Sequence, residues 1–197
     1  MVVSESRQGI LGAVLLQVAR AEIAQSLGLD AQITLPQDAP WLTARGASFV
    51  TLTKAGELRG CIGTLEAHRP LIEDVRNNAR AAAFGDPRFT PLRREEFNAV
   101  SVEVSLLSPP ERLAVETEAQ ALARLRPQID GVVLEYAGHR ATFLPQVWEH
   151  LPEPRQFLQQ LKRKAGLPVD FWADTLRVSR YAVQKWKEPE RAQSGGS

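Results

Sequence analysis

The sequence predicts an α+β fold with a mostly antiparallel sheet and packed helices, arranged as one domain or as two closely associated subdomains. Three observations support this fold class. Residues 100–106 alternate between aliphatic and polar side chains, which is the pattern of a half-buried strand. Apolar residues between positions 10 and 23 instead recur with a period near 3.6, which is typical of a helix. Helical and strand patterns then alternate without βαβ spacing, and this order favours antiparallel pairing.

The first helix is predicted over residues 10–23, and Gly28 follows where a C-cap glycine would end it. The apolar run also resembles a signal peptide, but Glu5 offsets the charge of Arg7 and Gln17 interrupts the run. We therefore expect an amphipathic helix that docks on the core. Its apolar stripe contains Ile10, Leu11, Val14, Leu15, Val18 and Ile23.

A β-hairpin is predicted next, after a proline-bearing connector at residues 35–40. Residues 47–53 and 58–65 form its two strands, because both segments contain β-forming side chains. The turn between them contains Gly56, which tolerates a positive φ. This hairpin places Cys61 on its second strand.

A second helix is predicted from Pro70 to Gly85, because proline favours the first helical turn and glycine favours the end. One face of it is lined by Leu71, Val75, Ala79 and Ala82. A short helix at residues 91–97 and the strand at 100–106 follow, and Pro109-Pro110 ends this strand.

The second half of the chain again combines helices with a hairpin. The predicted elements are a helix at 116–124, hairpin strands at 131–136 and 140–144, a helix at 155–165 closed by Gly166, and a strand at 176–186. We expect the polar residues 188–197 to form a disordered tail, so that residues 1–187 make up the folded domain.

Composition excludes several classes of protein. The 24 lysines and arginines against 23 acidic residues give a net charge of +1, which argues against a general polyanion-binding surface. One cysteine excludes an intrachain disulfide, and with three histidines it excludes Cys₄ and Cys₂His₂ zinc sites. No stretch approaches the roughly 20 apolar residues that span a membrane. We expect a cytoplasmic protein that binds neither a metal nor a membrane.

The single cysteine lies in the hexapeptide LRGCIG at residues 58–63. The glycines let another backbone or a ligand approach the sulfur closely. In a regular strand, Arg59 and Cys61 would share one face, while Leu58 and Ile62 would face the core. A guanidinium near a thiol favours the reactive thiolate. The alternative is that Cys61 is a small buried apolar residue, as free cysteines often are.

Five short motifs occur in order along the chain. They are LRGCIGT at 58–64, DPRF at 86–89, VEVS at 102–105, FLPQV at 143–147 and KAGL at 164–167. With these motifs the chain resembles the AMMECR-one domain family over most of its length, from residue 5 to residue 187.

The resemblance implies a single AMMECR-one type domain over residues 1–187, with an α+β fold of two subdomains. It implies no firmly assigned enzymatic activity. In many prokaryotes this domain is encoded beside, or fused to, a Memo-type protein and a radical S-adenosylmethionine protein. The resemblance therefore implies a shared modification pathway, with both partners acting in trans.

The motif residues form the candidate site. Cys61 is the candidate nucleophile, and the candidate substrate-binding residues are Arg59, Gly60, Gly63, Thr64, Asp86, Arg88, Glu103, Gln146 and Lys164. A nucleophilic cysteine normally needs a base, for which the sequence offers Glu66 and Glu103. His68 and His139 lie outside the motifs, so we predict no Cys–His dyad.

Most of these residues also have a structural explanation. Asp86 is suited to capping the turn that follows it, whereas Arg88 is suited to binding a phosphate or carboxylate. Glu103 alternates with buried valines, as an exposed strand carboxylate does. Lys164 suits the negative end of a helix dipole, and Gln146 either lines a groove or turns the chain.

Three functions remain open from the sequence. The first is a cysteine-dependent transferase or hydrolase, without a cofactor, in a protein or small-molecule modification pathway, where Arg59 favours the thiolate or holds an anionic substrate. The second is a non-catalytic protein-binding module that uses the surface of residues 59–63. The third is a nucleic-acid-binding protein, which the near-neutral charge and the lack of a stacking platform disfavour.

Overall fold

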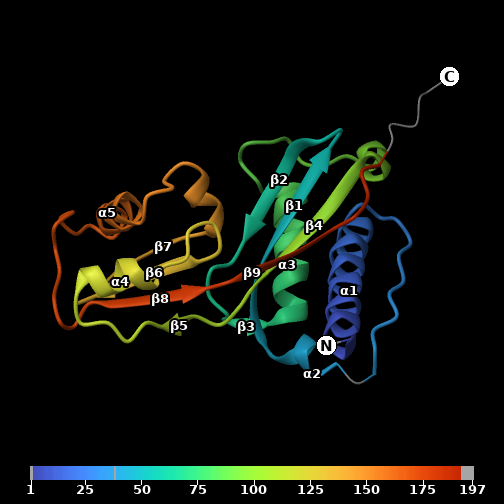
Figure 1. Cartoon of the computed structure of the whole chain (residues 1–197). Coiled ribbons are helices and arrows are strands. Elements are labelled where there is room, and N and C mark those ends of the chain that lie inside the picture. The colour runs from blue at the N-terminus through green and yellow to red at the C-terminus, as the bar shows by residue number, and fades with distance from the viewer. Residues whose placement is uncertain (1, 38, 192–197) are drawn as a thin grey trace. The chain divides into compact units, whose positions relative to one another are not determined.

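The computed structural model describes residues 2–37 and 39–191 (Figure 1). The chain forms two compact units. Unit 1 comprises the chain up to Leu106 together with the part from Gln184 onward, and unit 2 comprises Leu107–Val183. Each unit has its own sheet and its own helices, which confirms the predicted α+β fold class.

The sheet of unit 1 has the strand order β2-β1-β4-β9. Its strands are β1 (Arg45–Lys54), β2 (Glu57–Gly63), β4 (Val100–Leu107) and β9 (Val183–Lys187), and the short β3 (Arg69–Pro70) also pairs with β1. β1 and β2 form the predicted antiparallel hairpin. Ala55 and Gly56 in its turn have φ values of +52° and +81°, which match the twist of a tight hairpin.

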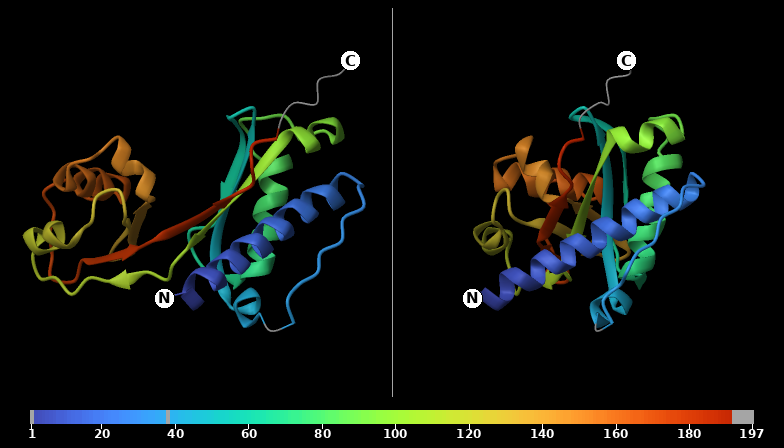
Figure 2. Two further views of the ribbon diagram at one scale, coloured as in Figure 1. Left: turned by 45° about the vertical axis from the view of Figure 1, so that its right-hand side comes forward. Right: turned by 90° about the vertical axis from the view of Figure 1, so that its right-hand side faces the viewer.

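Two long helices, α1 (Val2–Ser26) and α3 (Leu71–Phe84), cover one face of this sheet (Figure 2). α3 packs on β1 and β2, and α1 packs on α3. The short helices α2 (Pro40–Thr43) and η1 (Arg94–Ala99, a 3₁₀ helix) complete the unit. Its core includes Leu15, Val18, Ile23, Val50, Leu52, Val75, Ala79 and Val102.

The predicted N-terminal helix is confirmed, and Gly28 follows it with a φ of +69°. Ile10 is the exception on its apolar stripe, because it is 55% exposed. Within the described residues, the structure has no helix that combines the length and the apolar character needed to cross a membrane.

A β-bulge interrupts β2 at Arg59. Leu58 pairs with Thr53 and Gly60 pairs with Leu52, so Arg59 is the extra residue in the ladder. The bulge reverses the alternation of side chains, and Leu58 falls on the face opposite Leu52, where it is 44% exposed. The expectation that Leu58 faces the core with Ile62 is therefore wrong.

The sheet of unit 2 has the order β5-β8-β6-β7. Its strands are β5 (Glu111–Arg112), β6 (Gly131–Tyr136), β7 (His139–Phe143) and β8 (Arg177–Tyr181), and its helices are α4 (Glu118–Arg124), η2 (Pro145–Glu149, 3₁₀) and α5 (Pro154–Lys164). The rings of Trp148 and Phe157 stack at 3.7 Å in its core. β6 and β7 form the second predicted hairpin.

The predicted final strand at 176–186 is two strands. β8 ends at Tyr181 in the sheet of unit 2, and β9 begins at Val183 in the sheet of unit 1. Hydrogen bonds from the Ser108 amide to the Ala182 carbonyl and from the Glu188 amide to the Val102 carbonyl, both 2.9 Å, run in antiparallel register. Unit 2 is thus inserted between two neighbouring strands of unit 1. Of the predicted tail, residues 192–197 lie outside the described residues.

Candidate functional site around Cys61

Cys61 lies on β2, the edge strand of the sheet in unit 1, and is partly buried. It pairs with Thr51, whose neighbours Val50 and Leu52 are fully buried in the core. Because strand side chains alternate, Thr51 and Cys61 occupy the face opposite that core. The Thr51 hydroxyl donates a hydrogen bond to the sulfur at 3.2 Å.

The backbone of Cys61 is held by two side chains from the loop after α3. The Cys61 amide donates to Oδ2 of Asp86 at 2.9 Å, and Nη2 of Arg88 donates to the Cys61 carbonyl at 3.2 Å. The Asp86–Arg88 pair therefore occupies the outer edge of β2 as a neighbouring strand would. We call Cys61, Thr51, Asp86 and Arg88 the Cys61 cluster.

Asp86 and Arg88 also bind each other closely. Nε and Nη2 of Arg88 donate to the two carboxylate oxygens of Asp86 at 3.0 and 2.7 Å. The hydrogen bonds from Arg88, and then that from the Cys61 amide, hold the pKa of Asp86 far below its usual range. The hydrogen bonds to the Asp86 carboxylate raise the pKa of Arg88.

The Asp86 carboxylate also accepts from the Arg88 backbone amide at 3.1 Å, so it caps its own turn as the structural alternative proposed. The side chain of Asp86 is nearly fully buried, whereas that of Arg88 is 54% exposed. Arg88 is therefore the member of the pair that an incoming anion can reach.

Arg59 does not contact the thiol as the strand pattern predicted. Its Nε and Nη2 donate to the two carboxylate oxygens of Glu96 at 3.2 and 3.0 Å. These bonds are the main reason that the pKa of Glu96 falls to about 2. The bulge is the physical cause, because it breaks the alternation that would have aligned Arg59 with Cys61.

Gly60 and Gly63 allow close packing within the unit. A Cβ at Gly60 would lie 2.1 Å from the carbonyl oxygen of Ala82 in α3. A Cβ at Gly63 would lie 2.1 Å from the ring of Phe49. Close approach was predicted at both glycines, and in this structure the approaching groups are a helix backbone and an aromatic ring.

Thr64 belongs to a buried polar network that joins the end of β2 to α3. Its hydroxyl donates to Oδ1 of Asp74 at 2.8 Å, while the Ser48 amide and hydroxyl donate to Oδ2 at 2.8 and 2.7 Å. The side-chain amide of Asn78 donates to the Ser48 carbonyl at 2.9 Å. The sequence analysis did not identify Asp74 and Asn78. The available indication was that two polar residues, four positions apart, lie beside the apolar face of the predicted helix.

The remaining predicted residues lie elsewhere. Glu103 on β4 forms an ion pair with Lys185 on β9 at 3.9 Å, and the Glu66 carboxylate lies 3.0 Å from Nε2 of His68. Gln146 and Lys164 belong to unit 2, where Gln146 is exposed and Lys164 donates to the Thr142 carbonyl at 2.9 Å. Of the predicted residues, Asp86 and Arg88 are thus hydrogen-bonded to Cys61, whereas Arg59 binds Glu96 and Thr64 binds Asp74.

One aromatic residue, Phe89, and one acidic residue, Glu96, lie near the Cys61 cluster. The guanidinium carbons of Arg59 and Arg88 lie 5.9 and 5.5 Å from the centroid of the Phe89 ring, which is within the range of cation–π attraction. Glu96 also accepts from Lys54 at 3.1 Å. Neither Glu96 nor Thr51 carries a sequence signal that would have assigned it to this region.

Comparison with protein families shows what the chain is similar to. A model of the AMMECR1 family matches residues 16–186. A protein of Methanothermobacter thermautotrophicus is 41% identical over 180 residues, which cover 90% of this chain and 94% of the relative. Protein MJ0810 of Methanocaldococcus jannaschii is 41% identical over 136 residues, or 68% of each chain.

A solved structure shares the fold. The crystal structure of the uncharacterized protein PH0010 from Pyrococcus horikoshii matches with a TM-score of 0.70 and 32% identity. The match covers 90% of this chain and 91% of that one. The agreement extends over both units, since so little of either chain lies outside it.

Proposed function

The chain belongs to the AMMECR1 family, and from this premise we propose that it acts through Cys61 as a cysteine-centred component of a modification pathway. One observation carries this proposal: Cys61 is partly exposed while its backbone amide and carbonyl are both fixed by the Asp86–Arg88 pair. A cysteine that only fills space does not need two side chains to fix its backbone, whereas a nucleophile gains from a fixed position.

The chemistry proposed is acyl-type transfer. The sulfur forms a bond to an acyl carbon, the bond from that carbon to its leaving group breaks, and the thiol proton passes through water to the leaving group. The half-exposed guanidinium of Arg88 supplies positive charge beside the reacting position, which favours an anionic oxygen on the acyl group. Arg59 supports this arrangement only indirectly, because it is bound to Glu96.

The first test is the rate at which Cys61 is alkylated by iodoacetamide at pH 7. The chain has one cysteine, so the signal comes from a single thiol. We expect faster reaction than for a cysteine in an unstructured peptide. Arg88→Gln should slow it about fivefold, because the loss of the positive charge removes about 1 kcal/mol of attraction to the thiolate.

Arg93→Gln is the matched control, because Arg93 is an exposed arginine of the same unit whose side chain is 78% exposed. It should leave the rate unchanged. A folded protein whose thiol reacts no faster than the peptide would overturn the catalytic proposal. Complementation of a strain lacking this gene gives a second readout, in which Cys61→Ser should fail.

A protein-binding module is the second candidate, and the apolar residues beside β2 favour it. Leu58 and Leu65 are 44% and 40% exposed; Leu58 lies near the start of the edge strand β2, and Leu65 lies just after its end. Such a module predicts the opposite pattern in the complementation assay: Cys61→Ser succeeds, and Leu58→Ser fails.

Partners in trans form part of the same proposal. The family resemblance suggests a Memo-type protein and a radical S-adenosylmethionine protein. Purification of the tagged chain together with co-expressed candidates of these two types tests the association. Loss of binding in Leu58→Ser but not in Arg93→Gln would assign the contact to the region around β2.

A further inference from the structure

Unit 2 contains an open cleft whose lining residues belong to none of the five sequence motifs. It lies between the chain that follows β5 and helix α4, and its volume is about 670 Å³. Clefts that bind small molecules typically measure roughly 300–1,000 Å³. The cleft is therefore large enough for a small organic ligand.

The cleft includes apolar residues that are fixed in place. Leu113 and Leu176 line it and are only 5% and 3% exposed. The Leu113 amide donates to the Val178 carbonyl of β8, and the Leu176 amide donates to the Ala173 carbonyl, both at 2.9 Å. Ala114, which is exposed, and Val115, which is partly buried, line the cleft beside them. A ligand that covers Ala114 and Val115 would remove apolar surface from water without first ordering the chain.

Two exposed arginines, Arg112 and Arg124, line the same cleft. In the part of the chain that the structure describes, neither guanidinium has a hydrogen bond or an ion pair. Nearby arginines behave differently, since Arg126 is bound to Asp130 at 2.7 Å and Arg180 to Glu111 at 3.2 Å. The two cleft arginines are thus available to an external acceptor.

One wall of the cleft is braced by hydrogen bonds. Oε1 of Gln120 accepts from the Glu116 amide at 2.8 Å, and the Glu116 carbonyl accepts from the indole of Trp172 at 2.9 Å. This leaves the side-chain NH₂ of Gln120 as a further donor. The carboxylate of Glu116 is the only acidic group among the lining residues, so two arginines and one glutamate give the lining a charge of +1.

We propose that this cleft binds an organic monoanion that consists of one carboxylate on an apolar body. The planar forks of Arg112 and Arg124 match a carboxylate, and the accessible apolar residues Ala114 and Val115 match the body. A lining charge of +1 suits one negative charge, and the Glu116 carboxylate disfavours a dianionic phosphate. The proposal is independent of the function assigned to Cys61.

Octanoate is a suitable probe, titrated into the ¹⁵N-labelled full chain. We expect saturable shifts in the amide signals of Leu113, Gln120 and Leu176. Arg112→Ala and Arg124→Ala should each weaken binding about tenfold, because a hydrogen bond to a charged group contributes about 1.5 kcal/mol or more. Ala114→Phe, which fills the cleft and keeps both arginines, should abolish saturation.

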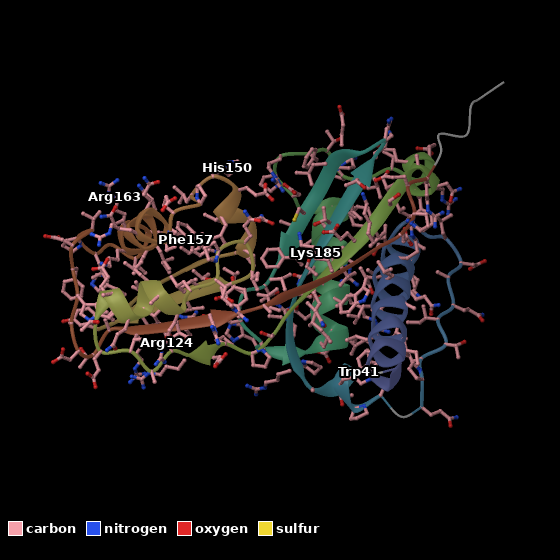
Figure 3. All side chains as sticks on the ribbon, in the orientation of Figure 1. Trp41, Arg124, His150, Phe157, Arg163 and Lys185 are labelled. Carbon is pink, nitrogen blue, oxygen red and sulfur yellow. The ribbon has the colours of Figure 1, made fainter. Side chains whose placement is uncertain are left out.

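Arg163→Ala is the matched control. Arg163 is another exposed arginine of unit 2, and Figure 3 labels it on α5, on the opposite side of the unit from Arg124. This variant should bind octanoate as the unmodified chain does. The amide spectrum of each variant reports whether unit 2 is still folded.

Three results would overturn the proposal. The first is that millimolar octanoate shifts none of the cleft amides in a saturable manner. The second is that octan-1-ol binds as tightly as octanoate, which would mean that the carboxylate is not recognised. The third is that folded Arg112→Ala and Arg124→Ala variants bind octanoate with unchanged affinity.

Discussion

The indole of Trp186 on β9 packs against Gly12 in α1. A Cβ at Gly12 would lie 2.1 Å from Cδ1 of the indole, closer than any real contact. Gly9, one turn earlier in the same helix, has no atom within 4 Å of such a Cβ. The two glycines therefore differ in packing while sharing a helical backbone.

This contrast gives a paired prediction for stability. Gly12→Ala should lower the free energy of unfolding by about 1–3 kcal/mol, because the ring must shift in a packed site. Gly9→Ala should raise it by up to about 1 kcal/mol, because alanine is the better helix former. Urea unfolding followed by circular dichroism measures both. Stabilisation by both variants would show that the indole moves freely.

The residues around Cys61 show how far sequence reasoning reaches at this scale. The ordered motifs placed Asp86 and Arg88 among the candidate site residues, and both side chains are hydrogen-bonded to the backbone of Cys61, although 25 residues separate Cys61 from Asp86. The partner of Arg59 was not predicted, because Glu96 lies 37 residues away in a segment without a motif. Side-chain bonds of this kind depend on backbone geometry that hydrophobic periodicity does not encode.

At the scale of elements, Glu96 joins three segments of unit 1. Its carboxylate accepts from Arg59 in the bulge of β2 and from Lys54 at the end of β1. It also accepts from the Arg93 backbone amide at 3.1 Å, which caps η1. One carboxylate thus fixes the hairpin to the helix that leads into β4.

This link should weaken in acid. The pKa of Glu96 is about 2 in the folded protein and 4.5 without these contacts, so its ionised form stabilises the fold. Its contribution is complete above pH 4.5 and is lost as the pH falls towards 2. Glu96→Gln should therefore be less stable than the unmodified chain at pH 6, with the difference shrinking as the pH is lowered to 3.

Glu95→Gln is the control for this series, because Glu95 is the exposed neighbour of Glu96 on η1. Urea midpoints measured from pH 6 to pH 3 provide the comparison. The lowered pKa of Asp86 makes the stability of the parent and of the variant depend on pH in the same way. The difference in stability between the two proteins therefore reports on Glu96. A difference that stays constant with pH would contradict the assignment.

Most helices and both hairpins could be predicted from hydrophobic periodicity and from the positions of glycine and proline. Two features of the fold could not be predicted in this way. The bulge at Arg59 has no signal in an alternating pattern, and the split at Ala182 lies inside a segment whose β-propensity is continuous. Both concern which strand a segment pairs with, and pairing depends on contacts remote in sequence.

At the scale of the whole molecule, each unit has its own hydrophobic core, and among the described residues the two cores have no member in common. We expect Phe157→Ala to remove about 3–5 kcal/mol from the stability of unit 2, because a large ring leaves a cavity. Amide exchange should then accelerate in β6, β7 and α5, while α3 keeps its protection. Equal acceleration in α3 would show that the two units unfold as one.

The insertion of unit 2 between β4 and β9 has a consequence during synthesis. The ribosome makes β1, β2 and β4 first, yet the sheet of unit 1 lacks its outer strand until all of unit 2 has followed. During that interval β4 presents an unpaired edge, which is the kind of surface on which chains associate wrongly. Once unit 2 folds, the Ser108–Ala182 bonds bring its two ends together, so β9 emerges already beside its partner. A chain that stops within unit 2 would leave that edge permanently open.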